Sequence, residues 1–192
     1  ADGAEGGANP GTLVGMDDTN HVFGKSGKAI KFDGGQVEIQ GYKGIGGTNP
    51  RTMAAWIKTT NDDIAIMSWG ENASGRKWTF RLDQGKLRVE VNGGNRLGTA
   101  VVNDGQWHHV AAALPYGADG IEDVVFYVDG ANDVATGTAS FAIDTASTTD
   151  LRIGYDFSNR AFDGLIDDVR LYSSALSLDD VTSLYLDGGR RF

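Results

Sequence analysis

A loop between two predicted strands gathers side chains that could hold a sugar. Tyr155 and Phe157 supply aromatic rings, and Asp156, Asn159 and Arg160 supply polar or charged groups. Aromatic rings stack on the apolar faces of sugar rings, while amides and charged groups fix the hydroxyls. We therefore predict that this loop binds a glycan. The alternative is that both rings pack beneath the loop, as aromatic side chains beside turns often do.

Trp69 and Trp78 offer two further rings, one at each end of a Gly-, Asn- and Ser-rich loop. Partial exposure at those strand ends would let both indoles join the same sugar site, and the packing alternative applies to them too. Trp56 and Trp107 lie in compact apolar segments, so we expect them in the core.

Asp167 shares the alternation of Val169 and Leu171, which predicts that it faces the interior, whereas Asp168 shares the alternation of Arg170 and faces out. A buried carboxylate must be paired, hydrogen-bonded or metal-bound, because leaving it bare costs several kcal/mol. Two interpretations stay open: a metal ligand, or an acceptor of backbone N–H groups or partner of a histidine or arginine.

The histidines and the known catalytic motifs give no support for catalysis. His108 and His109 are adjacent, so on a strand they point to opposite faces and cannot share a site. His21 is the only other histidine, so no cluster completes a metal centre or a general base. The zincin, nucleophile-elbow, P-loop and dinucleotide-binding motifs are absent from the sequence. We interpret the His108–His109 pair as structural and predict no catalytic residue.

Composition narrows the choice of partner. The net charge of −9 argues against nucleic acid and polyanionic glycans, which need clusters of Lys and Arg, and suits neutral glycans and hard cations. The chain has no cysteine, which excludes disulfides and zinc–thiolate sites. No apolar run approaches the length of a membrane span, so we expect no membrane insertion.

Short apolar segments separated by Gly- and Asp-rich turns predict an all-β fold, an antiparallel β-sandwich. The predicted strands are residues 29–32, 36–39, 51–58, 64–69, 77–82, 86–91, 97–102, 106–114, 123–128, 140–143, 150–154 and 165–172. One short C-terminal helix should follow Ser177, with Asp180 completing a pair like a capping box. Residues 1–16 read as a flexible N-terminal arm or linker, and residues 17–192 as a single domain.

Several segments together resemble the laminin-G-like jelly rolls of the concanavalin A-like lectin and glucanase superfamily. In chain order they are KAIKFDG (28–34), TMAAWIK (52–58), WHHVA (107–111), YVDG (127–130), LRIG (151–154), FDGLIDDVRLY (162–172) and ALS (175–177). The resemblance covers residues 27–186 and implies a jelly roll that presents binding loops. It also implies a structural calcium ion near Asp33 and Asp167, with backbone carbonyls and water completing about six to eight oxygen ligands.

The resemblance also frames the function. A glucanase of that superfamily carries two Glu with an Asp between them on one strand, and no such run occurs here. We therefore predict a non-catalytic carbohydrate-binding module of a secreted or cell-surface bacterial protein. Its partner would be a glycan or polysaccharide, and it would be part of a larger multidomain protein. The alternatives are an adhesion or spacer domain that contacts protein and, third, a polysaccharide hydrolase or lyase.

Overall fold

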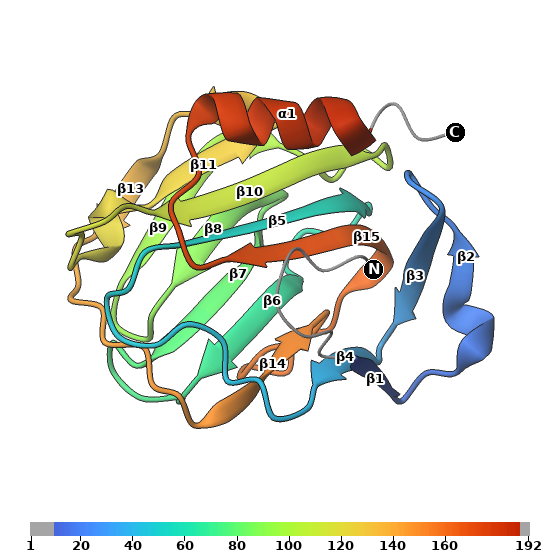
Figure 1. The fold of residues 1–192 in the computed structure, drawn as a ribbon, viewed down its shortest axis with the longest axis horizontal. Coiled ribbons are helices and arrows are strands. Elements are labelled where there is room, and N and C mark those ends of the chain that lie inside the picture. Colours follow the sequence, from blue (N-terminus) through green and yellow to red (C-terminus); the bar gives the residue numbers. More distant parts are fainter. Residues whose placement is uncertain (1–9, 189–192) are drawn as a thin grey trace.

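Two antiparallel β-sheets face each other across a hydrophobic interior (Figure 1). The computed structural model describes residues 10–188, except for the side chains of residues 137–139. The predicted antiparallel sandwich of jelly-roll type, with a C-terminal helix, is confirmed.

One sheet has eight strands in the order β1-β4-β14-β6-β7-β8-β9-β13. Their bounds are β1 Gly11–Val14, β4 Gln36–Ile39, β14 Thr149–Ile153, β6 Ala65–Gly70, β7 Lys77–Asp83, β8 Lys86–Glu90, β9 Asn95–Val101 and β13 Thr136–Ala139. The other has seven strands in the order β12-β11-β10-β5-β15-β3-β2. Their bounds are β12 Ala131–Asp133, β11 Val125–Val128, β10 His108–Leu114, β5 Arg51–Lys58, β15 Asp163–Tyr172, β3 Lys28–Asp33 and β2 His21–Phe23. Two short 3-10 turns, η1 Asp18–Asn20 and η2 Ile121–Asp123, complete the connections.

Alternate side chains of each strand point inward and fill the space between the two sheets. The eight-stranded sheet contributes large rings, and the indoles of Trp69 and Trp78 stack with their centroids 6.2 Å apart. From the seven-stranded sheet, Met53 and Ile57 of β5 project into the same cluster. β5 is buried along nearly its whole length, because α1 and neighbouring segments cover its other face.

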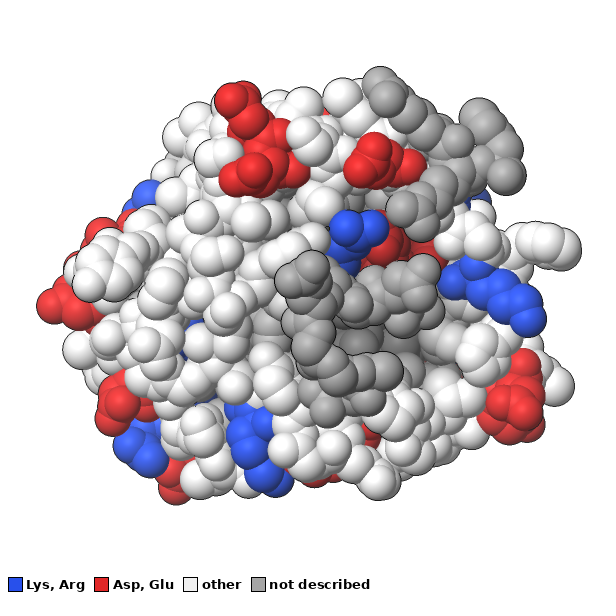
Figure 2. Space-filling model, viewed as in Figure 1, with Lys and Arg blue, Asp and Glu red and all other residues white. Residues whose placement is uncertain are grey.

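The helix α1 (Leu178–Gly188) lies across the outer face of the seven-stranded sheet (Figure 1). The sheet presents Ala54, Ala111 and Ala113 there, and these small side chains let Val181 pack closely. The predicted capping pair is confirmed: Ser177 N donates to the Asp180 carboxylate at 2.9 Å, and Asp180 N donates to Ser177 Oγ at 3.2 Å. Acidic side chains stand out over this helix in the face shown in Figure 2.

A β-bulge in β15 reverses the predicted orientation of Asp167. The register against β5 shifts between Asp167 and Arg170, and Asp168 has a positive φ of 47°. Asp167 pairs with Trp56 and Arg170 pairs with Ala54, so both side chains lie on the outer, helix-covered face. The prediction that Asp167 faces the interior is wrong, because the bulge inserts one residue into the alternation.

The start of the chain, a later segment and one tryptophan also differ from prediction. Gly11–Val14, assigned to the flexible arm, forms the edge strand β1 paired with β4, while residues 1–9 lie outside the described part. Residues 140–143 are not a strand and contribute only an isolated bridge between Gly120 and Ala142. Trp107 is partly exposed rather than core. Within residues 10–188, no helix combines the length and apolarity that a membrane span requires.

Candidate functional site

The outer face of the eight-stranded sheet carries a cluster of charged side chains around Glu90. Trp78, Phe80 and Val89 point inward, so the intervening residues of β7 and β8 point outward. Those outward residues include Lys77, Arg81, Arg88 and Glu90. Although they face out, Lys77 is only 5% exposed and Glu90 only 8%. The cluster is therefore held in fixed positions at the surface.

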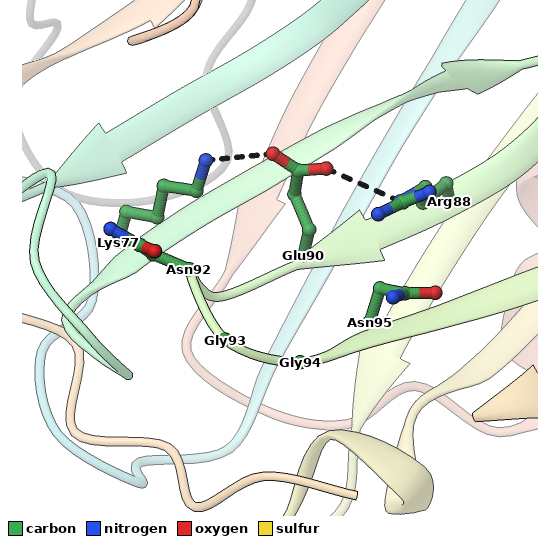
Figure 3. Close-up of a pocket in the computed structure, with 7 residues that line it drawn as sticks. All are labelled: Lys77, Arg88, Glu90, Asn92, Gly93, Gly94 and Asn95. Atoms are coloured by element: carbon green, nitrogen blue, oxygen red, sulfur yellow. Dashed lines mark hydrogen bonds and ion pairs between the residues drawn. The ribbon is translucent and has the colours of Figure 1, made fainter. Parts of the chain in front are cut away.

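Each carboxylate oxygen of Glu90 faces two cationic nitrogens. Oε1 lies 2.7 Å from Lys77 Nζ and 2.7 Å from Arg160 Nη2. Oε2 lies 3.0 Å from Arg81 Nε and 3.2 Å from Arg88 Nε. Figure 3 shows the Lys77 and Arg88 contacts from either side of the carboxylate. Burial alone would raise the pKa of Glu90, but hydrogen bonds and charges from Lys77 and Arg160 outweigh it and lower that pKa to about 2.

A surface pocket of about 330 Å³ opens beside this cluster (Figure 3). Its lining is polar: Lys77, Arg88, Glu90, Asn92, Gly93, Gly94 and Asn95. Asn92, Gly93 and Gly94 lie in the turn that joins β8 to β9, and Asn95 is the first residue of β9. Gly93 is required in this turn, because its φ is +113° and a Cβ there would lie 2.8 Å from the ring of Phe141. The pocket therefore has two amides and two cations in its wall and an aromatic ring behind its turn.

The loop predicted to bind sugar lies on the same face and meets the cluster through Arg160. Asp156 is 1% exposed, and it accepts hydrogen bonds from the backbone N–H groups of Ser158 and Arg160. The Arg160 guanidinium bridges the Asp156 carboxylate, at 2.7 Å, and Glu90. At the start of the loop, the hydroxyl of Ser68 in β6 donates to the Tyr155 carbonyl at 2.7 Å. The loop and the pocket thus share Glu90.

The remaining predicted loop residues lie at the surface of this segment. Tyr155 is partly exposed, and its hydroxyl donates to the Asn159 side chain at 2.9 Å. The ring of Phe157, also partly exposed, lies 4.7 Å from the guanidinium of Arg152. Both rings therefore have polar neighbours, and their role in ligand binding stays a prediction.

Trp69 and Trp78 do not belong to the site. Both are 0% exposed, and their stacked indoles lie between the two sheets. Trp69 Nε1 donates to the Ile45 carbonyl at 3.0 Å, so even its polar edge is satisfied inside. The prediction that these rings contact a sugar is wrong, because the alternation of β6 and β7 turns them inward.

Asp33 and Asp167 are not brought together to hold one ion. Asp33 stands opposite Asp163 in the β3–β15 ladder, and Asp167 lies four residues further along β15. At roughly 3.3 Å per residue, that separation is about 13 Å. The described residues contain no group of three or more His, Cys, Asp or Glu side chains placed to hold a metal. The predicted pair of calcium ligands is wrong, and calcium binding by other groups stays a prediction.

The Asp167 carboxylate accepts hydrogen bonds from backbone N–H groups, which was the alternative to a metal ligand. Oδ2 accepts from Ser26 N at 2.7 Å, and Oδ1 accepts from Asp168 N at 2.7 Å. Burial raises the pKa of Asp167, and these backbone hydrogen bonds lower it only in part. The carboxylate thereby joins the β2–β3 turn to the bulge in β15.

The two histidines have structural surroundings. His109 is buried against the Trp56 ring, with centroids 5.4 Å apart, beneath α1. His108 Nδ1 lies 2.8 Å from the Asp129 carboxylate and its Nε2 lies 3.1 Å from Asp104. Burial alone would lower the pKa of His108, but these two carboxylates outweigh it and raise that pKa.

Sequence reasoning missed the pocket itself. The alternation at residues 86–91 places Arg88 and Glu90 outward, and an Asn-Gly-Gly-Asn turn follows. Those signals are local. That Lys77 and Arg160 converge on Glu90 depends on the pairing of β7 with β8 and on the path of a loop 70 residues away.

Comparisons with known proteins agree with this architecture. Domain 4 of AbnA, a GH43 extracellular arabinanase from Geobacillus stearothermophilus, in complex with arabinotriose, has 22% identity and a TM-score of 0.69 over 92% of this chain and 88% of that chain. The Ruminococcus gnavus IT-sialidase CBM40 bound to α2,3 sialyllactose has 15% identity and a TM-score of 0.58 over 82% and 97%.

A third similar structure is the botulinum neurotoxin serotype D ligand binding domain in complex with N-acetylneuraminic acid. It has 16% identity and a TM-score of 0.60, and the match covers 93% of this chain and 46% of that one. This chain thus spans about half the length of the toxin domain. At these identities the three likenesses show the fold. The comparison with curated proteins found no match.

The profile of the Laminin_G_3 family, described as the concanavalin A-like lectin/glucanases superfamily, matches residues 32–182. That match runs from the end of β3 into α1 and so includes the pocket and the loop. The chain belongs to the concanavalin A-like lectin/glucanases superfamily.

Proposed function

We propose that this chain is a non-catalytic carbohydrate-binding module that holds its ligand on the outer face of the eight-stranded sheet. The observation that carries the proposal is the polar pocket beside Glu90, whose wall combines two amides with two cations. Amides and cations bind sugar hydroxyls, and the ion pairs of Lys77 and Arg88 with Glu90 reduce the side-chain entropy that these two cations lose on binding. The superfamily and the sugar-bound structures of similar fold support the same class of ligand.

The state of Glu90 supports binding rather than catalysis at this pocket. A general acid must hold a proton near the working pH. The pKa of Glu90 is about 2, so this carboxyl is ionised at neutral pH. Its oxygens also lie within 3.2 Å of four cationic nitrogens, and this ion pairing disfavours their attack on a sugar. We place the module in a secreted or cell-surface bacterial protein with further domains, as its extracellular and toxin-derived likenesses suggest.

A glycan array followed by titration calorimetry tests the proposal. The parent protein should bind at least one oligosaccharide, and Asn95→Ala should weaken that binding about three- to tenfold, the effect of losing one neutral hydrogen bond. The matched control is Asn132→Ala, which removes an exposed amide from β12 of the other sheet and should change nothing.

Two results would count against the proposal. An array with no bound glycan, together with capture of a specific protein, would favour the adhesion or spacer interpretation. Glycan binding that is unchanged in Asn95→Ala would move the site away from the pocket.

A further inference from the structure

We infer that the pocket beside Glu90 selects sugars that carry a single carboxylate, such as a uronic acid or another sugar acid. This inference rests on the proposed function and names the ligand class of the same site. It depends on which hydrogen-bonding groups the pocket still has to offer after its internal contacts are made.

Glu90 has little acceptor capacity left for a ligand. An ionised carboxylate has about four acceptor positions, two on each oxygen. Lys77 and Arg160 occupy the two at Oε1, and Arg81 Nε occupies one at Oε2. Arg88 Nε lies 3.2 Å from Oε2 in an ion pair without a hydrogen bond. A sugar hydroxyl that donated to Glu90 would therefore have one position, at Oε2 beside Arg88.

The cations keep donors that Glu90 does not use. The Lys77 ammonium has three N–H groups, of which one donates to Glu90 Oε1 at 2.7 Å. The Arg88 guanidinium has five, and it pairs with Asp83, at 2.6 Å, and with Glu90, at 3.2 Å. The spare N–H groups of these two cations leave the pocket wall rich in hydrogen-bond donors, while Glu90 and Asp83 balance their charges.

A ligand that fits this wall must bring acceptors. A carboxylate forms charge-assisted hydrogen bonds that are about twice as strong as those of a neutral hydroxyl. Asn92 and Asn95, which donate and accept, can bind the neighbouring hydroxyls whichever way these point. One acidic sugar flanked by neutral ones therefore matches the pocket better than an all-neutral chain.

The charge of the whole protein limits the ligand to few carboxylates. The chain carries −9, so a polyanion that extends beyond the pocket meets repulsion over the rest of the surface. Charges beyond about 8 Å are screened at physiological salt, which leaves a single carboxylate governed by the nearby cations. Polysulfated chains should therefore bind poorly even though the pocket wall is rich in hydrogen-bond donors.

The test is an array that carries acidic oligosaccharides, each beside its carboxyl-reduced counterpart, in which the carboxylate has become a neutral hydroxymethyl group. The parent protein should prefer the acidic member of at least one pair by about tenfold or more, as one charge-assisted hydrogen bond predicts. Arg88→Gln and Lys77→Met should each reduce the preference for the acidic member to about threefold or less. The matched control is Arg152→Gln, which removes a cation from the same sheet face outside the pocket and should keep the preference.

The outcomes separate the two claims. Equal binding of acidic and reduced members overturns the ligand class while the proposed function stands. A preference lost in Arg152→Gln but kept in Arg88→Gln overturns the pocket as its source. No binding by any member overturns both. Lys77 is buried, so its variant is compared with Arg88→Gln, whose side chain is 23% exposed, and each is first shown to melt cooperatively.

Discussion

Arg160 and Glu90 are 70 residues apart in the chain and meet at 2.7 Å, Nη2 to Oε1. This contact fastens the β14–β15 loop to the outer face of β8. It also places the predicted binding loop and the pocket side by side, since Glu90 lines the pocket and contacts the loop through Arg160.

Arg160→Ala should lower the free energy of unfolding by about 2–4 kcal/mol, measured by urea denaturation. The substitution leaves the Asp156 carboxylate, which is 1% exposed, without its cation, and breaking a buried pair in this way is strongly destabilising. Arg152→Ala, which removes the stacking partner of Phe157, is the control and should cost about 1 kcal/mol or less. Equal midpoints for the two variants would contradict a fastening role for Arg160.

Trp69→Ala should lower the free energy of unfolding by about 3–5 kcal/mol, because it empties a large volume between the sheets. Tyr116→Ala removes a ring that is 91% exposed and should change stability by about 0.5 kcal/mol or less. Thermal and chemical denaturation of the two variants side by side give the comparison. If Trp69→Ala kept its stability and lost sugar binding, the indole would belong to the binding surface after all.

Acidification should destabilise the domain through His109. The pKa of this imidazole is lowered from 6.5 to about 4, mainly by burial; the charges of Asp168 and Asp129 oppose that shift, and the charge of Arg170 adds a smaller lowering effect. Between these two values the unfolded chain binds a proton that the folded chain does not, so stability falls as the pH drops from about 6.5 to about 4 and levels off below. The loss is about 3 kcal/mol.

Two measurements check the His109 prediction. NMR titration of the imidazole Cε1–H should report a folded-state pKa near 4, and the fall in unfolding free energy over that pH window should be shallower in His109→Gln. An imidazole that titrates near 6.5 in the folded protein would refute its burial in the neutral form.

Asp167→Ala should lower the free energy of unfolding by about 1–3 kcal/mol in the presence of a chelator. The substitution deprives the backbone N–H groups of Ser26 and Asp168 of their acceptor, and this loss needs no metal ion. Thermal melting with excess chelator and with excess calcium separates the two interpretations. An ion held by Asp167 would raise the melting temperature of the parent but not of the variant. Parent and variant that melt together in chelator would refute the hydrogen-bonding role.

Local signals predicted much of the fold. The alternation of Leu87 and Val89 with charged residues fixed the orientation of β8, and Ser177 with Asp180 fixed the start of α1. The orientation of Asp167 was missed because the bulge at Asp168 is set by how β15 pairs with β5, and no residue type there announces it. The indoles of Trp69 and Trp78 were judged by the turns beside them, yet strand parity decides which way they point.

The candidate site was only half predictable for the same reason. The loop from Tyr155 to Arg160 is contiguous, so its inventory of rings and polar groups is visible in the sequence. The cations around Glu90 come from β7, β8 and that loop, and they meet only once the sheet has formed. Their positions around Glu90 therefore depend on contacts between residues that are far apart in the sequence.

The position of α1 has a practical consequence. The helix covers the outer face of the seven-stranded sheet, whereas the pocket opens on the outer face of the eight-stranded sheet, on the opposite side of the sandwich. A fluorophore or sensor chip coupled through the exposed side of α1 would therefore leave the pocket facing the solution. If the pocket binds the surface of an insoluble polymer, α1 will face away from that surface, toward the solution.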